Sequence, residues 1–174
     1  EIYRLKGGYK TYRTYTFEKV RGNYPLLVLG GKTGTGKTVL LNKLKEGGEQ
    51  VIDLEGLAHH KGSSFGSIGQ KPQPTVEQFE NLLAVELRIM DLSHPIWVEN
   101  ESRTIGSCAL PEAIYNQMRK SPVLEMKVPI EVRMNRITHE YGSFSIEELT
   151  ACSEKVKKRM GPQHLKMALD LLHS

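Results

Sequence analysis

One octapeptide constrains this chain more than any other stretch. Gly31-Lys32-Thr33-Gly34-Thr35-Gly36-Lys37-Thr38 fits the pattern G-x-x-x-x-G-K-[ST] at every fixed position. The apolar run 26–29 that precedes it is typical of a buried strand, and residues 38–44 after it have helical spacing. The sequence therefore predicts a strand, a loop and a helix in the order that a phosphate-binding loop, or P-loop, requires.

The chemistry of this loop follows from its backbone. Glycines allow positive φ angles and a close approach, so that successive N–H groups face an anion at the positive end of the next helix. The ammonium group of Lys37 adds charge for the outer phosphates, and the hydroxyl of Thr38 is a candidate ligand of Mg²⁺. The predicted phosphate-binding residues are Gly31, Thr33, Gly34, Thr35, Gly36, Lys37 and Thr38.

Two carboxylates follow the next predicted strand. Residues 51–56, VIDLEG, are typical of a short buried strand that ends in Asp53 and Glu55. Ligands of open α/β sheets sit outside the carboxyl ends of the strands, so these side chains are candidate catalytic groups, as a base or as water-mediated metal ligands. An N-cap or a surface ion pair is the alternative.

A third predicted strand, 96–99, brings Glu99 to the same edge. Glu99 is the best candidate for the acidic residue that a P-loop protein places near its metal, together with Thr38. Arg103 is a candidate catalytic clamp for a phosphate, or it forms an ion pair with Glu99 or Glu101; the sequence leaves both readings open.

The segment 56–75 is long, polar and rich in glycine and proline. Such loops are usually functional or disordered, and this one follows the acidic site directly. We therefore predict a substrate-contacting loop, against the alternative of a mobile insertion. Its candidate contacts are His59, His60, Ser63, Ser64 and Gln70.

Two stretches carry excess positive charge. Residues 1–23 interleave basic and aromatic side chains, which suits nucleic acid through Lys10 and Arg13, or suits a linker that packs on a neighbouring domain. Lys157, Lys158 and Arg159 form a second basic face, which is either simply solvated or available to a polyanion.

Length and composition set the outer bounds. The 174 residues suffice for one domain with its own core, and the net charge of +4 permits a polyanionic partner without requiring one. No apolar run is long enough to span a membrane. Cys108 and Cys152 have no metal-site or disulfide-framework spacing, and a reducing cytoplasm is the expected location.

The alternation of strands and helices after a P-loop predicts an α/β fold. We expect a P-loop NTPase-like, mainly parallel sheet with helices on both faces. Further strands are expected at 51–56, 96–99 and 123–128, and helices at 75–90, 111–121, 129–141 and 163–173.

Three motifs resemble the bacterial tRNA 2-selenouridine synthase family. The most distinctive is the segment 51–82, which contains DLEGLAHHKGSSFGSIGQKPQPT; LGGKTGTGKT and WVENESRTIG resemble the P-loop and third-strand motifs of that family. The opening LKGGYKTYR resembles the turn and helix that close a rhodanese domain. The resemblance therefore implies that residues 1–23 are the tail of a rhodanese domain or a linker, and that residues 24–174 are the P-loop domain.

The resemblance implies a transferase that acts on tRNA. It would convert the wobble 2-thiouridine to 2-selenouridine with selenophosphate as selenium donor, with geranyl transfer from geranyl diphosphate as an associated step. The family's chalcogen-handling cysteine lies in the rhodanese domain, an expected partner of which this sequence carries only the tail, and neither Cys108 nor Cys152 matches it.

The residues leave open which anion the loop holds. The diphosphate of a prenyl donor, selenophosphate, a tRNA phosphate, and ATP or GTP all suit its N–H groups. Two rival functions follow: a P-loop nucleotide kinase or NTPase, and a non-catalytic tRNA-binding module.

Overall fold

The computed structural model describes residue 2 and residues 4–173. Within these residues the main sheet has four parallel strands in the order β2 (Gln50–Ile52), β3 (Ile96–Glu99), β1 (Leu26–Gly30) and β6 (Val123–Glu125). Leu29 of β1 lies opposite Glu99 of β3. The P-loop thus leaves the sheet beside the end of β3, and the predicted α/β fold of P-loop NTPase type is confirmed.

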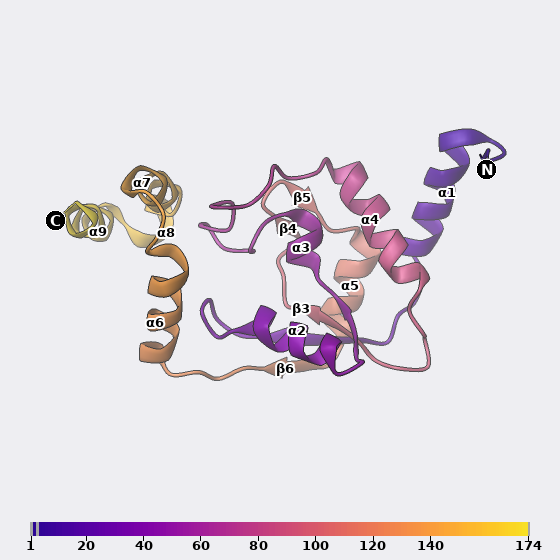
Figure 1. Cartoon of the computed structure of the whole chain (residues 1–174), viewed down its shortest axis with the longest axis horizontal. Coiled ribbons are helices and arrows are strands. Elements are labelled where there is room, and N and C mark those ends of the chain that lie inside the picture. The colour runs from indigo at the N-terminus through magenta and orange to yellow at the C-terminus, as the bar shows by residue number, and fades with distance from the viewer. Residues whose placement is uncertain (1, 3, 174) are drawn as a thin grey trace.

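Alternating side chains of the strands build two cores. Val28, Ile52 and Val98 face one side of the sheet, which is covered by α3 (Leu54–Ala58), α4 (Val76–Arg88) and α5 (Glu112–Lys120). Leu29 and Val51 face the other side, which is covered by Leu41 of α2 (Lys37–Glu46). Because side chains alternate between the two faces, β1, β2 and β3 lie between helices on either side of the sheet, whereas β6 at the edge is exposed (Figure 1).

Helix α1 (Gly8–Val20) packs against α4. The guanidinium of Arg13 donates to Asn81 Oδ1 at 2.6 Å and pairs with Glu80 Oε2 at 2.5 Å, and it stacks on the ring of Phe17. Val20 adds its side chain to the larger core. This helix is therefore attached to the P-loop domain by both polar and apolar contacts.

The last helices form a separate array beside the P-loop. They are α6 (Ile130–Tyr141), α7 (Ile146–Lys155), α8 (Lys157–Met160) and α9 (Pro162–Leu172). Figure 1 shows α6 as an upright column connected to β6 by an extended segment, with α7, α8 and α9 at its upper end. Tyr141, Cys152 and Leu165 supply its buried side chains.

Two expected strand ends were wrong, and one hairpin was not expected. The strand expected at 51–56 ends at Ile52, because Asp53 caps α3 by accepting the Gly56 N–H at 2.7 Å. The strand expected at 123–128 ends at Glu125, because β1, its one partner among the described residues, ends opposite it at Gly30. A short antiparallel hairpin, β4 (Thr104–Ile105) and β5 (Cys108–Ala109), carries no strong period and was not predicted.

Side-chain caps fix the starts of two helices. Thr75 caps α4 by accepting the Gln78 N–H, and Ser145 and Glu148 form a complete capping box on α7. Among the described residues, no helix is long and apolar enough to cross a lipid bilayer.

Candidate functional site

The P-loop forms an open cradle of backbone amides. Gly31, Gly34 and Gly36 have φ angles of 149°, 80° and 88°, values that residues with a Cβ rarely adopt. Gly36 is the N-cap of α2 and provides no side-chain cap, so the first N–H groups of the helix face the loop without a side-chain acceptor. This arrangement favours an anion at the helix N-terminus.

Two side chains of the loop are positioned where they could contact such an anion. The Nζ atom of Lys37 donates to the Gly31 carbonyl at 2.9 Å, which folds the ammonium group back over the loop. The hydroxyl of Thr35 is buried and has no hydrogen-bond partner among the described residues. A buried unpaired hydroxyl costs free energy, so a ligand oxygen at this position would be stabilising.

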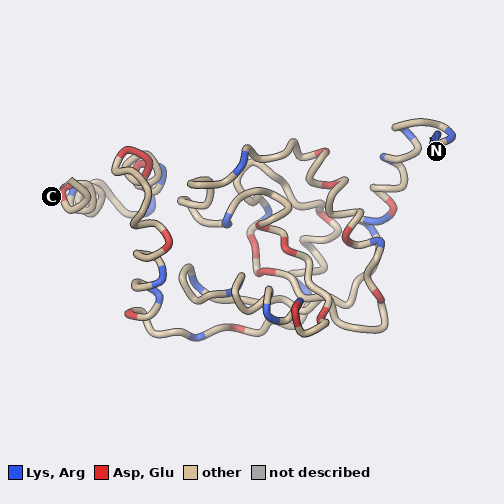
Figure 2. Tube along the Cα trace, viewed as in Figure 1, with Lys and Arg blue, Asp and Glu red and all other residues tan. Residues whose placement is uncertain are grey.

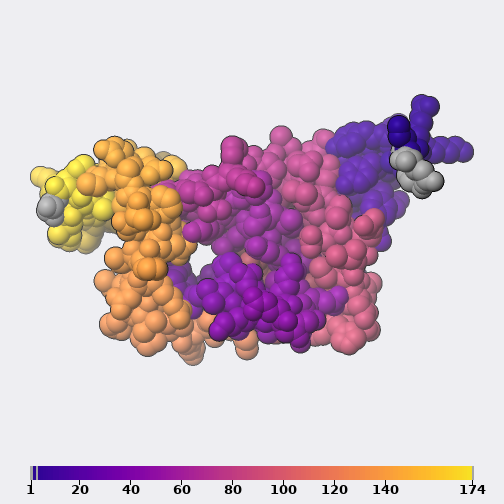
Figure 3. Space-filling model, viewed as in Figure 1, coloured from indigo at the N-terminus to yellow at the C-terminus, as the bar shows by residue number. Residues whose placement is uncertain are grey.

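A cavity of about 540 Å³ lies over this cradle. We call it the phosphate cavity. Its floor is residues 33–39, one wall is Asp53, Glu55 and Gly56, and the roof comes from the loop 59–70 and from α6. Figure 3 shows an opening between the column of α6 and the P-loop side of the molecule, so the cavity is reached from solvent. Its lining residues are Thr33, Gly34, Thr35, Gly36, Lys37, Thr38, Val39, Asp53, Glu55, Gly56, His60, Lys61, Gln70, Arg136, Glu140 and Tyr141.

Helix α6 brings arginine to the loop. Arg136 Nη1 donates to the Thr35 carbonyl at 2.5 Å, and Arg133 Nη1 donates to the Thr33 carbonyl at 3.3 Å. Both side chains extend from one face of the helix, three residues apart. Arg136 lines the phosphate cavity together with Lys37, so these two cations face the space above the amides, in addition to Lys61, which is paired with Glu140.

Acidic residues gather behind the cavity, near the middle of the molecule in Figure 2. Glu99 ends β3 and is fully buried; its Oε2 accepts the Leu54 N–H at 3.2 Å, and its Oε1 has no partner among the described residues. Burial, together with the nearby charge of Asp53, raises the pKa of Glu99 to about 8. Glu99 is therefore a carboxyl that is mostly protonated at neutral pH unless a cation lies beside it.

Glu55 and Glu101 form a facing carboxyl pair. The position that a Cβ would take on Gly62 lies 2.6 Å from Glu55 Oε1 and 2.7 Å from Glu101 Oε2, so only glycine fits between these residues. Burial raises the pKa of both carboxyls; the charge of Glu101 raises that of Glu55 further, and Lys37 opposes both shifts. The pair can therefore hold one proton between two carboxyls next to the phosphate cavity.

Part of the predicted loop 56–75 borders the phosphate cavity, although its first residues belong to α3. His60, Lys61 and Gln70 line the phosphate cavity, and Lys61 pairs with Glu140 of α6 at 2.5 Å. The His60 ring is half-buried, and burial lowers its pKa, followed by the charge of Lys155. Ser63 and Ser64 line two neighbouring cavities instead, and His59 is turned away, with its Nδ1 atom 2.9 Å from the Pro72 carbonyl.

Several candidates from the sequence are not at the phosphate cavity. Arg103 lies outside its lining and is 4.0 Å from Glu112, not beside Glu99 or Glu101, because the chain turns away into β4. The guanidinium of Arg13 is engaged by Glu80 and Asn81, which leaves it poorly placed for a nucleic-acid phosphate. Lys10, Lys157 and Lys158 are exposed, and Arg159 lines two side cavities.

Sequence reasoning missed the contribution of α6 to the site. Arg136, Glu140 and Tyr141 of this helix line the phosphate cavity, and Glu101 was named only as a possible ion-pair partner of Arg103. The spacing of Arg133 and Arg136 was a usable signal, because two arginines three apart share a helix face. The direction of that face toward the P-loop was not visible in the sequence.

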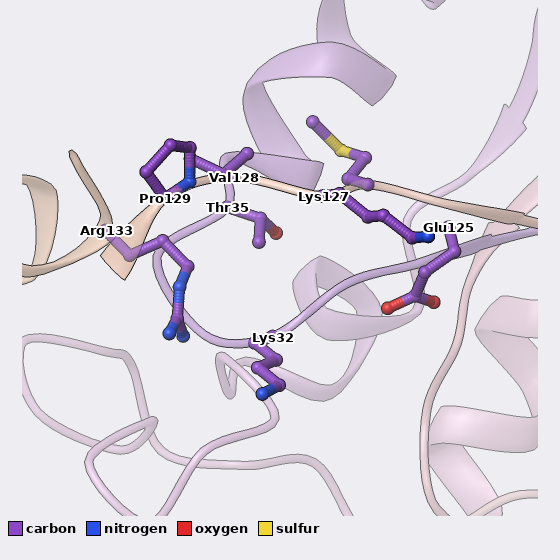
Figure 4. A pocket seen from close by; sticks show the side chains of 8 residues that line it. Lys32, Thr35, Glu125, Lys127, Val128, Pro129 and Arg133 are labelled. Carbon is purple, nitrogen blue, oxygen red and sulfur yellow. The ribbon is translucent and has the colours of Figure 1, made fainter. Parts of the chain in front are cut away.

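A second cationic cavity of about 540 Å³ lies on the other side of the loop. Figure 4 shows Lys32 and Thr35 from the P-loop, Arg133 from α6, and Glu125 and Lys127 at and beyond the end of β6. Thr35 borders both this cavity and the phosphate cavity. The P-loop is thus flanked by cations on two sides.

Comparison with known proteins places this site in a family. A family model described as the tRNA 2-selenouridine synthase AAA domain matches residues 24–173. A protein of Sulfurovum named tRNA 2-selenouridine synthase is 35% identical over 98% of this chain, and proteins of the same name from Serratia proteamaculans and Aeromonas salmonicida are 42% and 37% identical over 79% and 92% of it.

The chain spans about half or less of these relatives, at 51%, 37% and 48% of their lengths. The matched range begins just before β1 and contains the P-loop, the acidic cluster and the α6–α9 array. The chain therefore belongs to the family of the tRNA 2-selenouridine synthase AAA domain.

Proposed function

We propose that this chain is the phosphate-binding domain of an enzyme that converts the wobble 2-thiouridine of certain tRNAs to 2-selenouridine. Selenophosphate is the selenium donor in this proposal, and geranyl transfer from geranyl diphosphate onto the sulfur is an associated step. Family membership and the name shared by the relatives support the tRNA and selenium parts. Because those relatives are longer, the complete reaction belongs to the whole protein.

The role proposed for this domain is to hold the diphosphate of the geranyl donor. The observation that carries it is the open amide cradle under a cavity that also receives Lys37 and Arg136. Linked phosphates span such a loop better than a single carboxylate does, because several N–H groups and two cations face the same space.

The role of the loop in geranyl transfer follows from the negative charge that develops on the diphosphate. When the thiouridine sulfur attacks C1 of the geranyl group, a C–S bond forms, the C–O bond to diphosphate breaks, and negative charge grows on the leaving group. The loop amides and Lys37 stabilise that charge. The uridine N3 proton is lost to a base, and the Glu55–Glu101 pair, which can accept one proton, is the candidate for this role.

The two cysteines have no role in this proposal. Cys108 and Cys152 are both buried, and burial raises the pKa of the Cys108 thiol. A buried thiol with a raised pKa is a poor nucleophile. The chalcogen chemistry is therefore assigned to a rhodanese domain of the whole protein.

Mg²⁺ fits the oxygen ligands of the site. The Thr38 hydroxyl and Glu99 would hold it, since Mg²⁺ usually takes one or two carboxylates together with phosphate and water. The unpaired Oε1 of Glu99 is the observation that supports this, because a cation beside it would pair the orphaned oxygen and lower its pKa. When bound, the ion would supply further neutralisation of the diphosphate.

The tRNA is proposed to contact the exposed cations of α8. Lys157, Lys158 and Arg159 lie on one short helix at the edge of the α6–α9 array, and Arg159 also borders the polar cavity that contains His60 and Ser64. Lys10 of α1 is exposed and free to add a more distant contact with the tRNA backbone. Arg13 is left out of this surface, because its guanidinium binds α4.

Calorimetric titration tests the diphosphate role. The chain is titrated in parallel with geranyl diphosphate, selenophosphate, ATP and GTP, with and without Mg²⁺. We expect geranyl diphosphate to bind, and Lys37→Ala to weaken it about 10- to 100-fold, because a hydrogen bond to a charged group is lost. Lys32→Ala is the matched control in the same loop, since Lys32 does not line the phosphate cavity.

Two results would replace the proposal with a rival. Turnover of ATP or GTP by this chain, without binding of geranyl diphosphate, would identify a nucleotide-hydrolysing enzyme. Binding of tRNA with no affinity for any of the four phosphate compounds would identify a non-catalytic tRNA-binding module.

A further inference from the structure

A third cavity, of about 670 Å³, lies between the loop 59–67 and the α6–α9 array. We call it the apolar cavity. Its wall is mostly hydrocarbon, contributed by α6, α7, α8 and α9 and by the ring of Phe65. The apolar side chains that form this wall are Phe65, Ile137, Leu149, Val156, Met160 and Leu172. A cavity of this size and lining suits a small apolar ligand group.

The apolar cavity borders the phosphate cavity. Thr33 of the P-loop and Tyr141 of α6 line both spaces. Tyr141 is held between them: its ring is 5.7 Å from the ring of Phe65, and Lys61 Nζ lies 5.5 Å from its centre. One ligand can therefore place a charged end over the amides and an uncharged end beyond Thr33.

The wall of the phosphate cavity is polar and cationic, and the wall of the apolar cavity is mostly hydrocarbon. The phosphate cavity presents backbone amides, Lys37 and Arg136, whereas the apolar cavity presents few polar atoms toward its interior. The base and ribose of a nucleotide carry many hydrogen-bonding groups, and burying them against hydrocarbon without partners is unfavourable. A hydrocarbon tail has no such cost.

We propose that the apolar cavity binds the isoprenoid chain of the diphosphate donor, and that Met160 on α8 is a residue that limits the chain length it accepts. This inference rests on the function proposed above and adds a subsite to it. Because Thr33 and Tyr141 line both cavities, the carbon at which the chain meets the diphosphate would lie beside them, whereas Met160 lines the apolar cavity and not the phosphate cavity.

Affinity for a series of donors tests the subsite. Inorganic pyrophosphate, dimethylallyl diphosphate and geranyl diphosphate are titrated into the 174-residue chain. Each methylene that leaves water strengthens binding by about fourfold, so we expect affinity to rise at each step of this series. Equal affinity for all three compounds would overturn the subsite while leaving the diphosphate role of the P-loop intact.

A substitution at Met160 tests whether the isoprenoid chain binds in the apolar cavity. Met160→Trp fills part of the apolar cavity, and we expect at least a tenfold loss of affinity for geranyl diphosphate with no change for pyrophosphate. Met160 is 40% exposed, so the larger side chain has room to form without unfolding the helix. Met167→Trp on α9 is the matched control, because Met167 is 59% exposed and lies outside the cavity lining.

The remaining outcomes distinguish a failure of the isoprenoid subsite from a failure of the proposed diphosphate-binding function. If Met160→Trp binds every compound as the unsubstituted chain does, the tail lies elsewhere and the subsite is wrong. If Met160→Trp and Met167→Trp weaken geranyl diphosphate equally, the effect is not local and the subsite is again wrong. If neither pyrophosphate nor geranyl diphosphate binds the unsubstituted chain, the proposed function fails and the subsite fails with it.

Discussion

Glu99 shows how one residue combines structure with the chemistry of the site. As the last residue of β3, it is fixed beside Leu29 of β1 and receives the Leu54 N–H at the start of α3. Its second oxygen has no hydrogen-bond partner among the described residues, and burial is the largest cause of the raised pKa of this carboxyl. The carboxyl thus stabilises the protein only in its neutral form, or beside a cation.

The raised pKa of Glu99 predicts that the free energy of unfolding falls as pH rises. In the unfolded chain Glu99 titrates near its ordinary value of 4.5, whereas in the folded chain it titrates at about 8. Between these values the folded state retains a proton that the unfolded state loses, so raising the pH favours unfolding. Each pKa unit is worth about 1.4 kcal/mol.

Glu99→Gln removes this dependence, because an amide stays neutral and still accepts the Leu54 N–H. We expect the variant to be more stable than the unsubstituted chain by a few kcal/mol at pH 8.5 and nearly equal to it at pH 5, measured by denaturant unfolding at both pH values. Glu131→Gln, on the exposed side of α6, should leave the pH profile unchanged. Parallel profiles for Glu99→Gln and the unsubstituted chain would show that Glu99 ionises normally.

At the scale of elements, N-cap side chains explain why the start of α4 was predicted correctly and the end of β2 was not. Helix α4 was predicted within two residues because Thr75 is an N-cap and the apolar residues that follow have helical spacing. The same capping chemistry at Asp53 ended β2 early, where the apolar run alone favoured a longer strand. The hairpin β4–β5 has two-residue strands, which are too short to show any period.

Helix α8 carries a prediction about tRNA. Its exposed lysines contact phosphates in the proposed function, and each phosphate contact adds about 0.7 to 0.9 to the slope of log affinity against log salt concentration. Lys157→Gln combined with Lys158→Gln should therefore weaken tRNA binding at low salt and reduce the slope by roughly 1.5, measured by filter binding at several salt concentrations.

The double variant Lys43→Gln and Lys45→Gln is the control for this experiment. It removes the same charge from an exposed part of α2, away from α8. If both double variants change the slope equally, net charge alone governs the interaction and α8 is not a specific contact.

At the scale of the whole molecule, the contribution of the α1–α4 contact to the free energy of unfolding can be measured. Residues 1–23 were interpreted as a tail or linker, and α1 packs on α4 through Arg13. We expect Arg13→Ala to lower the free energy of unfolding by about 1–3 kcal/mol, because it removes the charge-assisted hydrogen bonds to Glu80 and Asn81 and leaves the partly buried Glu80 carboxylate without its cation. Lys10→Ala, on the exposed side of the same helix, should change it little.

The measurement is denaturant unfolding of both variants. Equal stability of Arg13→Ala and the unsubstituted chain would mean that the polar contacts of Arg13 add nothing to the stability of the folded unit.

The sequence predicted the sheet, the P-loop and the acidic edge, because these depend on residues that are neighbours in the chain or lie at strand ends. It did not predict the roof of the phosphate cavity. Arg136 and Lys61 meet there from segments about 75 residues apart, and no local pattern encodes that meeting. The role of Glu101 was also missed, because it depends on how Gly62 lets two carboxyls approach.

The ion pair between Lys61 and Glu140 is the link that closes that roof. Its side chains are 34% and 41% exposed, so water competes for both charges and the pair stabilises the closed arrangement by less than about 1 kcal/mol. A contact this weak breaks and re-forms readily by thermal motion. When Lys61 and Glu140 separate, the existing opening to the phosphate cavity widens for a ligand or a product, while the parallel strands beneath stay in place.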